Sequence, residues 1–156
     1  MGNGSVIKQE ILDYIASTPW AVLATVRGDG TPVIRTIGAF AFENGGGSVY
    51  FATFPGADKT RHIDGNSRVS FFFQHEGQQL QEFRNVELLG DAAKVNGEDD
   101  IRHVAALISE RSPIVQAFIE KNGIAVFDYY EVRVTEVKSL DYRNGIGPQA
   151  IEVVFL

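Results

Sequence analysis

Two basic side chains stand where the chain could bind an anion. The first, Arg35, lies in residues 32–37, where apolar residues follow the pattern of a β-strand. Because alternate residues of a strand share one face, Arg35 projects on the same side as Val33 and Ile37. A guanidinium group on an apolar face requires a negative partner, either a buried carboxylate of the protein or an anionic ligand.

The second, Lys59, follows the strand-like residues 48–54 and lies in residues 58–62, where a short helix is predicted to begin. The first turn of a helix offers free backbone N–H groups and a partial positive charge, and phosphate groups bind at such places. Together the two residues indicate a phosphate site. Spacing alone leaves a second interpretation open, in which Arg35 pairs with a carboxylate and Lys59 is an exposed helix residue.

The rest of the apolar pattern predicts an antiparallel sheet with a few helices. Helices are expected over residues 5–17, from Glu98 through Ile108, and from Ser112 to Asn122. The run 69–73 is typical of a strand buried on both faces, and Gly90 predicts a bulge in a bent strand. Strands are expected over residues 20–26, 31–42, 48–54, 69–73, 83–95, 125–140 and 151–155.

Hairpin-linked strands of this number fit a barrel, because closing a sheet removes its exposed edges. The glycine-rich residues 44–47 lie between two strand patterns and lack the Gly-Lys-Ser/Thr of a P-loop, so they are predicted to form a turn. No linker, repeat or low-complexity tract interrupts the pattern. We therefore expect a single domain over residues 1–156.

Composition narrows the possible functions. A net charge of −6 and a pI near 5.0 argue against a dedicated nucleic-acid-binding protein. The absence of cysteine excludes thiolate metal sites, thiol nucleophiles and disulfides, and we expect no metal site. No segment has the length and apolarity of a signal peptide or a membrane span. A cytoplasmic protein without a membrane partner is the expectation.

The order of several short motifs resembles the pyridoxamine 5'-phosphate oxidase-like FMN-binding split-barrel family. The resemblance covers residues 19–95, and the motifs that carry it are Gly30-Thr31-Pro32-x-x-Arg35, Tyr50-Phe51-Ala52-Thr53, Lys59-Thr60-Arg61, Asn66-Ser67-Arg68-Val69-Ser70 and Arg84-Asn85-Val86-Glu87-Leu88-Leu89-Gly90. It implies a mainly β fold, a six- to seven-stranded antiparallel split β-barrel with flanking helices. It also implies a homodimer that holds FMN in a groove between its subunits, and an oxidoreductase activity on a small-molecule substrate.

The resemblance assigns roles to eight residues of this chain. It places the FMN phosphate on Arg35, Lys59 and Thr60, and the edge of the flavin ring on the backbone of Thr36 and Ile37. It places the ring beside Ala52 and Thr53, and a side-chain amide near the flavin at Asn85. No catalytic acid or base is assigned, because the flavin itself supplies the redox chemistry.

One departure from the family concerns the substrate. The true pyridoxamine phosphate oxidases have a lysine five residues after the arginine, whereas this chain has Phe40. We therefore expect a different substrate from the vitamin B6 phosphates. Two alternatives stay open: a non-catalytic flavin- or haem-binding protein, and a reductase dependent on deazaflavin F420. Whether His62, His75 or the pair Tyr142-Arg143 contributes to the site also stays open, and His103 is expected on the exposed side of a helix.

Overall fold

The structure is a computed structural model that describes residues 6–156. Its helices are α1 (Gln9–Ala16), α2 (Asp58–Gly65), α3 (Glu98–Arg111) and α4 (Pro113–Asn122). Its strands are β1 (Ala21–Val26), β2 (Pro32–Ile37), β3 (Phe40–Glu43), β4 (Ser48–Thr53), β5 (Arg68–Phe73), β6 (Arg84–Lys94), β7 (Asp128–Asp141) and β8 (Ile151–Phe155).

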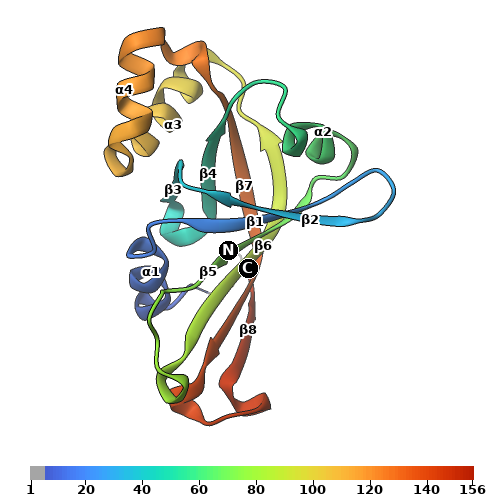
Figure 1. Cartoon of the computed structure of the whole chain (residues 1–156), viewed down its shortest axis with the longest axis vertical. Helices are drawn as coiled ribbons and strands as arrows, with labels where there is room; N and C mark the ends of the chain where they lie inside the picture. The colour runs from blue at the N-terminus through green and yellow to red at the C-terminus, as the bar shows by residue number, and fades with distance from the viewer. Residues whose placement is uncertain (1–5) are drawn as a thin grey trace.

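The strands form one antiparallel sheet in the order β2-β1-β5-β6-β7-β4-β3 (Figure 1). The two edge strands of this path, β2 and β3, are joined by only residues 38–39, so the sheet must curl to bring its edges together. The result is a half-barrel, and the predicted mainly β split barrel is confirmed. Seven strands lie on this path. The predicted strand over residues 151–155 is β8, an eighth strand, which pairs with the lower half of the long β7.

Several element boundaries differ from the prediction. The strand expected over residues 31–42 is two strands, because the chain turns at Gly38 from one edge of the sheet to the other. Strand β7 begins at Asp128 rather than at residue 125, since residues 124–126 form a 3₁₀ turn. Helix α1 begins at Gln9, and the predicted start at Ser5 lies outside the described residues.

The sheet is covered on only part of its surface. One core fills the barrel interior beneath α1, and a second lies between α3, α4 and the outer side of β3, β4 and β7. Strand β5 shows the consequence. Its residues Val69, Phe71 and Phe73 are buried, whereas Ser70 and Phe72 on its other face are half-buried, so the prediction of burial on both faces is wrong for one protomer. No element of residues 6–156 covers that second face.

The long β6 bends at the predicted place. Its register with β7 shifts between Leu89 and Gly90, which is the bulge expected there. A Cβ at Gly90 would lie 2.2 Å from the backbone oxygen of Arg133, so only glycine allows this close approach of the two strands. None of the helices formed by residues 6–156 combines the length and apolarity needed to span a bilayer.

Candidate functional site

A groove of about 270 Å³ opens between the free edge of β2, strand β4 and helix α4. Five of the eight predicted cofactor residues line it: Thr36, Ile37, Ala52, Thr53 and Lys59. Two further hollows, of about 310 and 460 Å³, lie beside α3 and contain none of the eight. The sheet thus gathers residues from three separate motifs at one place, and the larger hollows are elsewhere.

Strand β2 presents unpaired backbone groups at this groove. It forms one edge of the sheet, with β1 as its single neighbour. At the hairpin end of the pair, the N–H of Arg27 donates to the carbonyl oxygen of Thr31 over 2.8 Å. Because paired and unpaired positions alternate along an antiparallel ladder, the N–H and C=O of Thr36 point away from β1. They are free to bind a ligand in the groove, whereas the backbone groups of Ile37 point towards Ala21 of β1.

Arg35 projects from the face of β2 that also carries Ile37, and oxygen atoms of the protein hold its guanidinium group. Nη1 donates to Thr25 Oγ1 at 2.7 Å and to the carbonyl oxygens of Leu23 and Val33, each at 3.2 Å. Burial lowers the pKa of Arg35. No carboxylate of residues 6–156 makes an ion pair with it, so the buried-carboxylate interpretation is wrong.

Lys59 stands at the start of α2, near Arg35. Burial lowers the pKa of Lys59 and the charge of Arg35 lowers it further, while Asp58 acts in the opposite direction. Asp58, however, makes its own ion pair with Arg61. Within the described residues Lys59 has no ion-pair partner. Lys59 of the groove and the neighbouring Arg35 are therefore two cations, neither of which forms an ion pair with a carboxylate of the described residues.

The remaining two predicted residues are placed differently. Thr60 Oγ1 donates to the backbone oxygen of Ala57 at 2.6 Å, so its proton is used inside the first turn of α2. Asn85 lies on β6, where its Nδ2 donates to Gln74 Oε1 at 3.5 Å. Neither side chain lines the groove of a single protomer.

The wall of the groove that faces β2 is apolar, which the sequence did not reveal. Phe54, Phe118 and Phe127 form an aromatic cluster, with the ring centre of Phe54 5.7 Å from that of Phe118 and 5.0 Å from that of Phe127. Ile114, 72% exposed, lies on the same wall. The helix over residues 112–122 was predicted without a role, whereas its Ile114, Val115 and Phe118 line the groove.

None of the chain's three histidines lines the groove. His62 Nδ1 lies 2.8 Å from Thr25 Oγ1, and His103 Nε2 lies 2.6 Å from Glu43 Oε2. His75 stacks on the ring of Tyr14 with ring centres 3.7 Å apart. Each histidine is thus engaged with another part of the protein.

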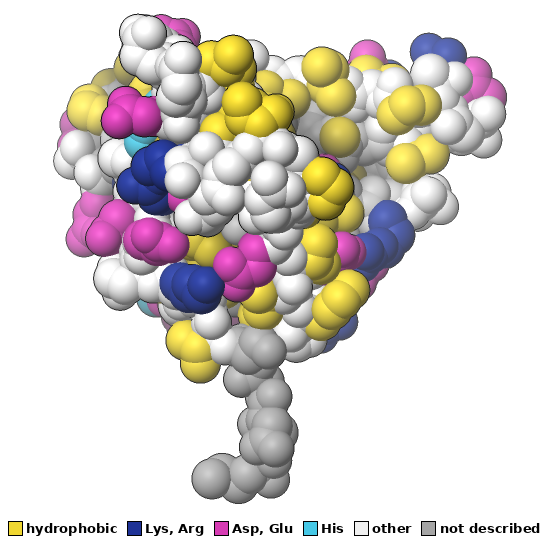
Figure 2. Space-filling model, turned by 90° about the horizontal axis from the view of Figure 1, so that it is seen from below, with side chains coloured by type: hydrophobic (Ala, Val, Ile, Leu, Met, Phe, Trp, Pro, Cys, Tyr) yellow, Lys and Arg dark blue, Asp and Glu magenta, His cyan; other side chains and the backbone are white. Residues whose placement is uncertain are grey.

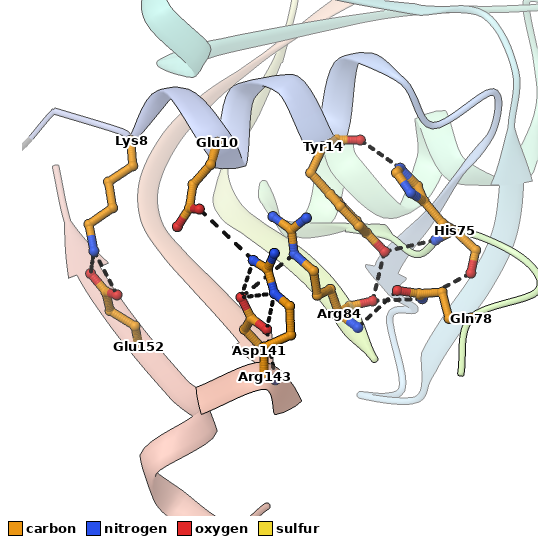
Figure 3. Close-up of polar contacts among 9 residues, drawn as sticks. All are labelled: Lys8, Glu10, Tyr14, His75, Gln78, Arg84, Asp141, Arg143 and Glu152. Carbon is orange, nitrogen blue, oxygen red and sulfur yellow. Dashed lines mark hydrogen bonds and ion pairs between the residues drawn. The ribbon is translucent and has the colours of Figure 1, made fainter. Parts of the chain in front are cut away.

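His75 and Arg143 belong to a separate network that fastens α1 to the sheet (Figure 3). The hydroxyl of Tyr14 donates to the backbone oxygen of Arg84 at 2.7 Å and accepts from the N–H of His75 at 2.9 Å. Arg143 donates to Asp141 through Nη2 at 2.6 Å. His75 and the Tyr142-Arg143 turn thus make contacts that hold parts of the protein together.

Comparison with known proteins gives a match to the family model described as pyridoxamine 5'-phosphate oxidase, over residues 7–141. A search of curated proteins gives no match. Among solved structures, a conserved hypothetical protein from Mycobacterium tuberculosis superposes with a TM-score of 0.72 at 22% identity, covering 92% of this chain and 89% of that one.

Two further solved structures share the fold and differ in what their names say they bind. A FAD-binding protein from Mesorhizobium loti gives a TM-score of 0.66 at 14% identity, with 86% of this chain and 94% of that one covered. The haem storage protein HutZ from Vibrio cholerae gives a TM-score of 0.66 at 18% identity, with 83% and 91% covered. The fold therefore accommodates more than one kind of cofactor.

Proposed function

This chain belongs to the pyridoxamine 5'-phosphate oxidase family, and from that premise we propose that it binds FMN with the phosphate at Arg35 and Lys59. The main observation behind the proposal is that these two neighbouring cations form no ion pair with a carboxylate of the described residues. Like charges placed together in a partly buried site raise the free energy of the empty protein. A dianionic phosphate would remove that cost and accept hydrogen bonds from both side chains.

The groove offers partners of the right kind for the rest of the cofactor. The free backbone N–H and C=O of Thr36 can bind the hydrogen-bonding edge of a flavin ring. Ala52 and Thr53 are both buried on β4 and both line the groove, so a ring can lie against this strand. When bound, FMN supplies the redox chemistry, and the residues of this chain bind the cofactor and orient the substrate.

Haem is the less favoured cofactor for this chain. A haem iron in a protein is held by an axial ligand such as histidine, cysteine, methionine or tyrosine. The groove is lined by none of the three histidines, and the chain has no cysteine and only Met1 as methionine. A phosphate-binding pair is, by contrast, what a flavin mononucleotide requires. The proposal therefore takes FMN over haem.

We propose that the protein is a homodimer and that the uncovered sheet face is its interface. The strand registers place exposed apolar side chains on that face: Ile34 on β2 and Ile151, Val153 and Phe155 on β8, between 42% and 70% exposed. Hydrophobic side chains are also visible among charged ones in the view of Figure 2. A two-fold contact would bury them.

The same face carries two of the predicted cofactor residues. Thr36 pairs with Val22, which pairs with Phe72 and through it with Glu87, two residues from Asn85. Thr36 and Asn85 therefore share one side of the sheet. In a two-fold dimer formed through this side, the Asn85 amide reaches the groove of the other protomer, which explains why a single protomer does not bring it there.

The substrate is proposed to be a small, apolar molecule without a phosphate group. Lys59 is the single charged side chain that lines the groove, and the proposal commits it to the cofactor. Phe40 is fully buried in the barrel core, so the substrate-phosphate lysine of the true oxidases has no equivalent. The aromatic wall of Phe54, Phe118 and Phe127 supplies the surface on which such a substrate can pack.

The test is the absorption spectrum of the protein after purification and after incubation with FMN, F420 or haemin followed by gel filtration. The proposal predicts flavin absorbance that co-elutes with the protein at about one FMN per protomer. Co-elution of haem or F420 in preference to FMN would overturn it. Turnover of electron donors by the loaded protein then separates an oxidoreductase from a carrier.

A further inference from the structure

Thr25 connects His62 to Arg35 through hydrogen bonds within the protein. Its side chain is buried on β1, with 1% of the residue exposed. Thr25 Oγ1 lies 2.7 Å from Arg35 Nη1 and 2.8 Å from His62 Nδ1. Arg35 Nη2 also approaches His62 Nδ1, at 3.5 Å. A hydroxyl is not required at a buried strand position, where valine is the usual residue.

The direction of the bond between Arg35 and Thr25 follows from what each group can donate. Arginine has donors and no acceptor, so Thr25 Oγ1 accepts from Nη1. Thr25 Oγ1 keeps a second lone pair and its own hydroxyl proton, so it can form the hydrogen bond to His62 Nδ1 whichever of the two atoms carries the proton.

The arrangement leaves one edge of the guanidinium group free. Nη1 has two protons, and three oxygen atoms of Thr25, Leu23 and Val33 surround it. No described residue accepts a hydrogen bond from Nε, and Nη2 has only the long contact to His62. The Nε–Nη2 edge is one of the two edges through which arginine binds a phosphate in a bidentate manner.

We propose that Thr25 and His62 are positioning residues, which hold Arg35 so that its Nε–Nη2 edge faces the cofactor phosphate. This inference rests on the proposed function and assigns roles that family membership alone does not. A side chain held before the ligand arrives loses little rotational freedom on binding, so the hydrogen bonds of Thr25 contribute to phosphate affinity without touching the phosphate. Binding of the flavin ring does not depend on them.

The experiment compares FMN with riboflavin, which has the same ring and no phosphate. Wild type, Thr25→Val and Thr25→Ser are titrated with each flavin, and the thermal melt of each variant is recorded to verify folding. Thr25→Val, which keeps the shape and removes the hydroxyl, should weaken FMN binding about tenfold, the effect of one hydrogen bond to a charged group. It should leave riboflavin binding unchanged. Thr25→Ser should restore FMN binding to within about threefold of wild type.

A purely structural role for Thr25 gives other results. If Thr25→Val weakens FMN and riboflavin equally, or if neither affinity changes, the inference is overturned. If Thr25→Val does not fold, the half-buried His62 is replaced by leucine and the variant is titrated with both flavins. His62→Leu should lower the affinity for FMN by about threefold and leave the affinity for riboflavin unchanged. A wild-type protein that binds neither flavin would contradict the proposed function itself, and the inference with it.

Discussion

Arg35 of β2 and Lys59 of α2 repel each other, and no carboxylate of residues 6–156 forms an ion pair with either. The charge of Asp58 raises the pKa of both side chains, but Asp58 forms its own ion pair with Arg61. A protein tolerates such an arrangement when it binds an anion there, because stability is lost in the empty state and recovered in the complex. The site should therefore show a trade-off between stability and binding.

Lys59→Met tests this trade-off. Folding lowers the pKa of Lys59, so the unfolded chain holds the lysine proton more readily and the charged side chain costs stability at neutral pH. That cost is relieved as the pH rises from the folded pKa towards the ordinary value of 10.5. The variant should raise the free energy of unfolding of the cofactor-free protein by about 0.5 to 1 kcal/mol at pH 7.

The same variant should bind FMN more weakly than wild type. Denaturant unfolding at pH 7 and pH 10 measures the first effect, and the gain over wild type should shrink at the higher pH. Lys121→Met, an exposed lysine of α4, serves as the control and should change neither quantity. A Lys59→Met protein that is less stable than wild type would remove the charge argument.

The buried Phe40 predicts that the protein does not oxidise pyridoxamine or pyridoxine 5'-phosphate efficiently. Phe40 packs against Phe42 and Phe73 with ring centres 5.5 and 5.8 Å away. A standard oxidase assay with FMN-loaded protein should give turnover well below about 1 per second, the lower end of typical enzyme rates. Turnover of about 1 to 10 per second would show that other residues bind the substrate phosphate.

Ile34→Asp tests the proposed dimer. Ile34 is 70% exposed in one protomer, so aspartate there is harmless to a monomer and places a charge in the interface of a dimer. We expect light scattering to give a dimer for wild type and a monomer for the variant, with FMN lost in parallel. Val6→Asp, at an 85% exposed position outside that face, is the control. A wild-type monomer that binds FMN would contradict the prediction.

Asp141→Asn should make the protein less stable at neutral pH. The guanidinium of Arg143 holds the pKa of Asp141 below its ordinary value, against the opposing effect of burial. Asp141 has an ordinary pKa near 3.8 in the unfolded chain and a lower pKa in the folded protein. Its carboxylate therefore stabilises the fold at pH values above 3.8, and this stabilisation is lost as the pH falls through the folded pKa. The variant should lose about 1 to 3 kcal/mol of unfolding free energy at pH 7.

Below pH 3 the difference between this variant and wild type should shrink, because wild-type Asp141 is then also becoming neutral. Urea unfolding across pH 2 to 7 measures both values. Glu120→Gln, which changes an exposed carboxylate of α4 without an ion pair among the described residues, is the matched control. An Asp141→Asn protein as stable as wild type at pH 7 would show that the Arg143 contact contributes nothing.

Much of the fold could be predicted from the sequence, because the periodicity of apolar residues depends only on neighbouring positions in the chain. Alternation predicted β2, strand-forming residues predicted β1, and helical spacing predicted α3. The break between β2 and β3 was missed because the apolar pattern continues through residues 38–39, and the chain changes direction there only to cross the open side of the barrel. The burial of β5 was overestimated since a sequence does not say which faces of a sheet are covered.

The candidate site divides in the same way. Arg35 and Lys59 could be predicted as site residues, because a charged side chain in an apolar strand or at the start of a helix is recognisable in the sequence. The structure brings the two together. Thr25 has no such recognisable feature, and its contact with His62 could not be predicted, because the two residues are 37 residues apart and meet only when α2 packs beside β1. The sequence also does not show that Phe118 lines the groove, because this depends on the position of α4 beside it.

Titration of the cofactor-free protein with FMN, for wild type and Arg35→Ala in parallel, measures whether the chain binds this cofactor through Arg35. We expect saturable binding at about one FMN per protomer. We also expect that the substitution weakens binding by about 1.5 to 3 kcal/mol, the range for a charge-assisted hydrogen-bonding group. Lys59→Ala should weaken it less, because a flexible ammonium group contributes less than a bidentate guanidinium. Equal dissociation constants for wild type and Arg35→Ala would contradict the account.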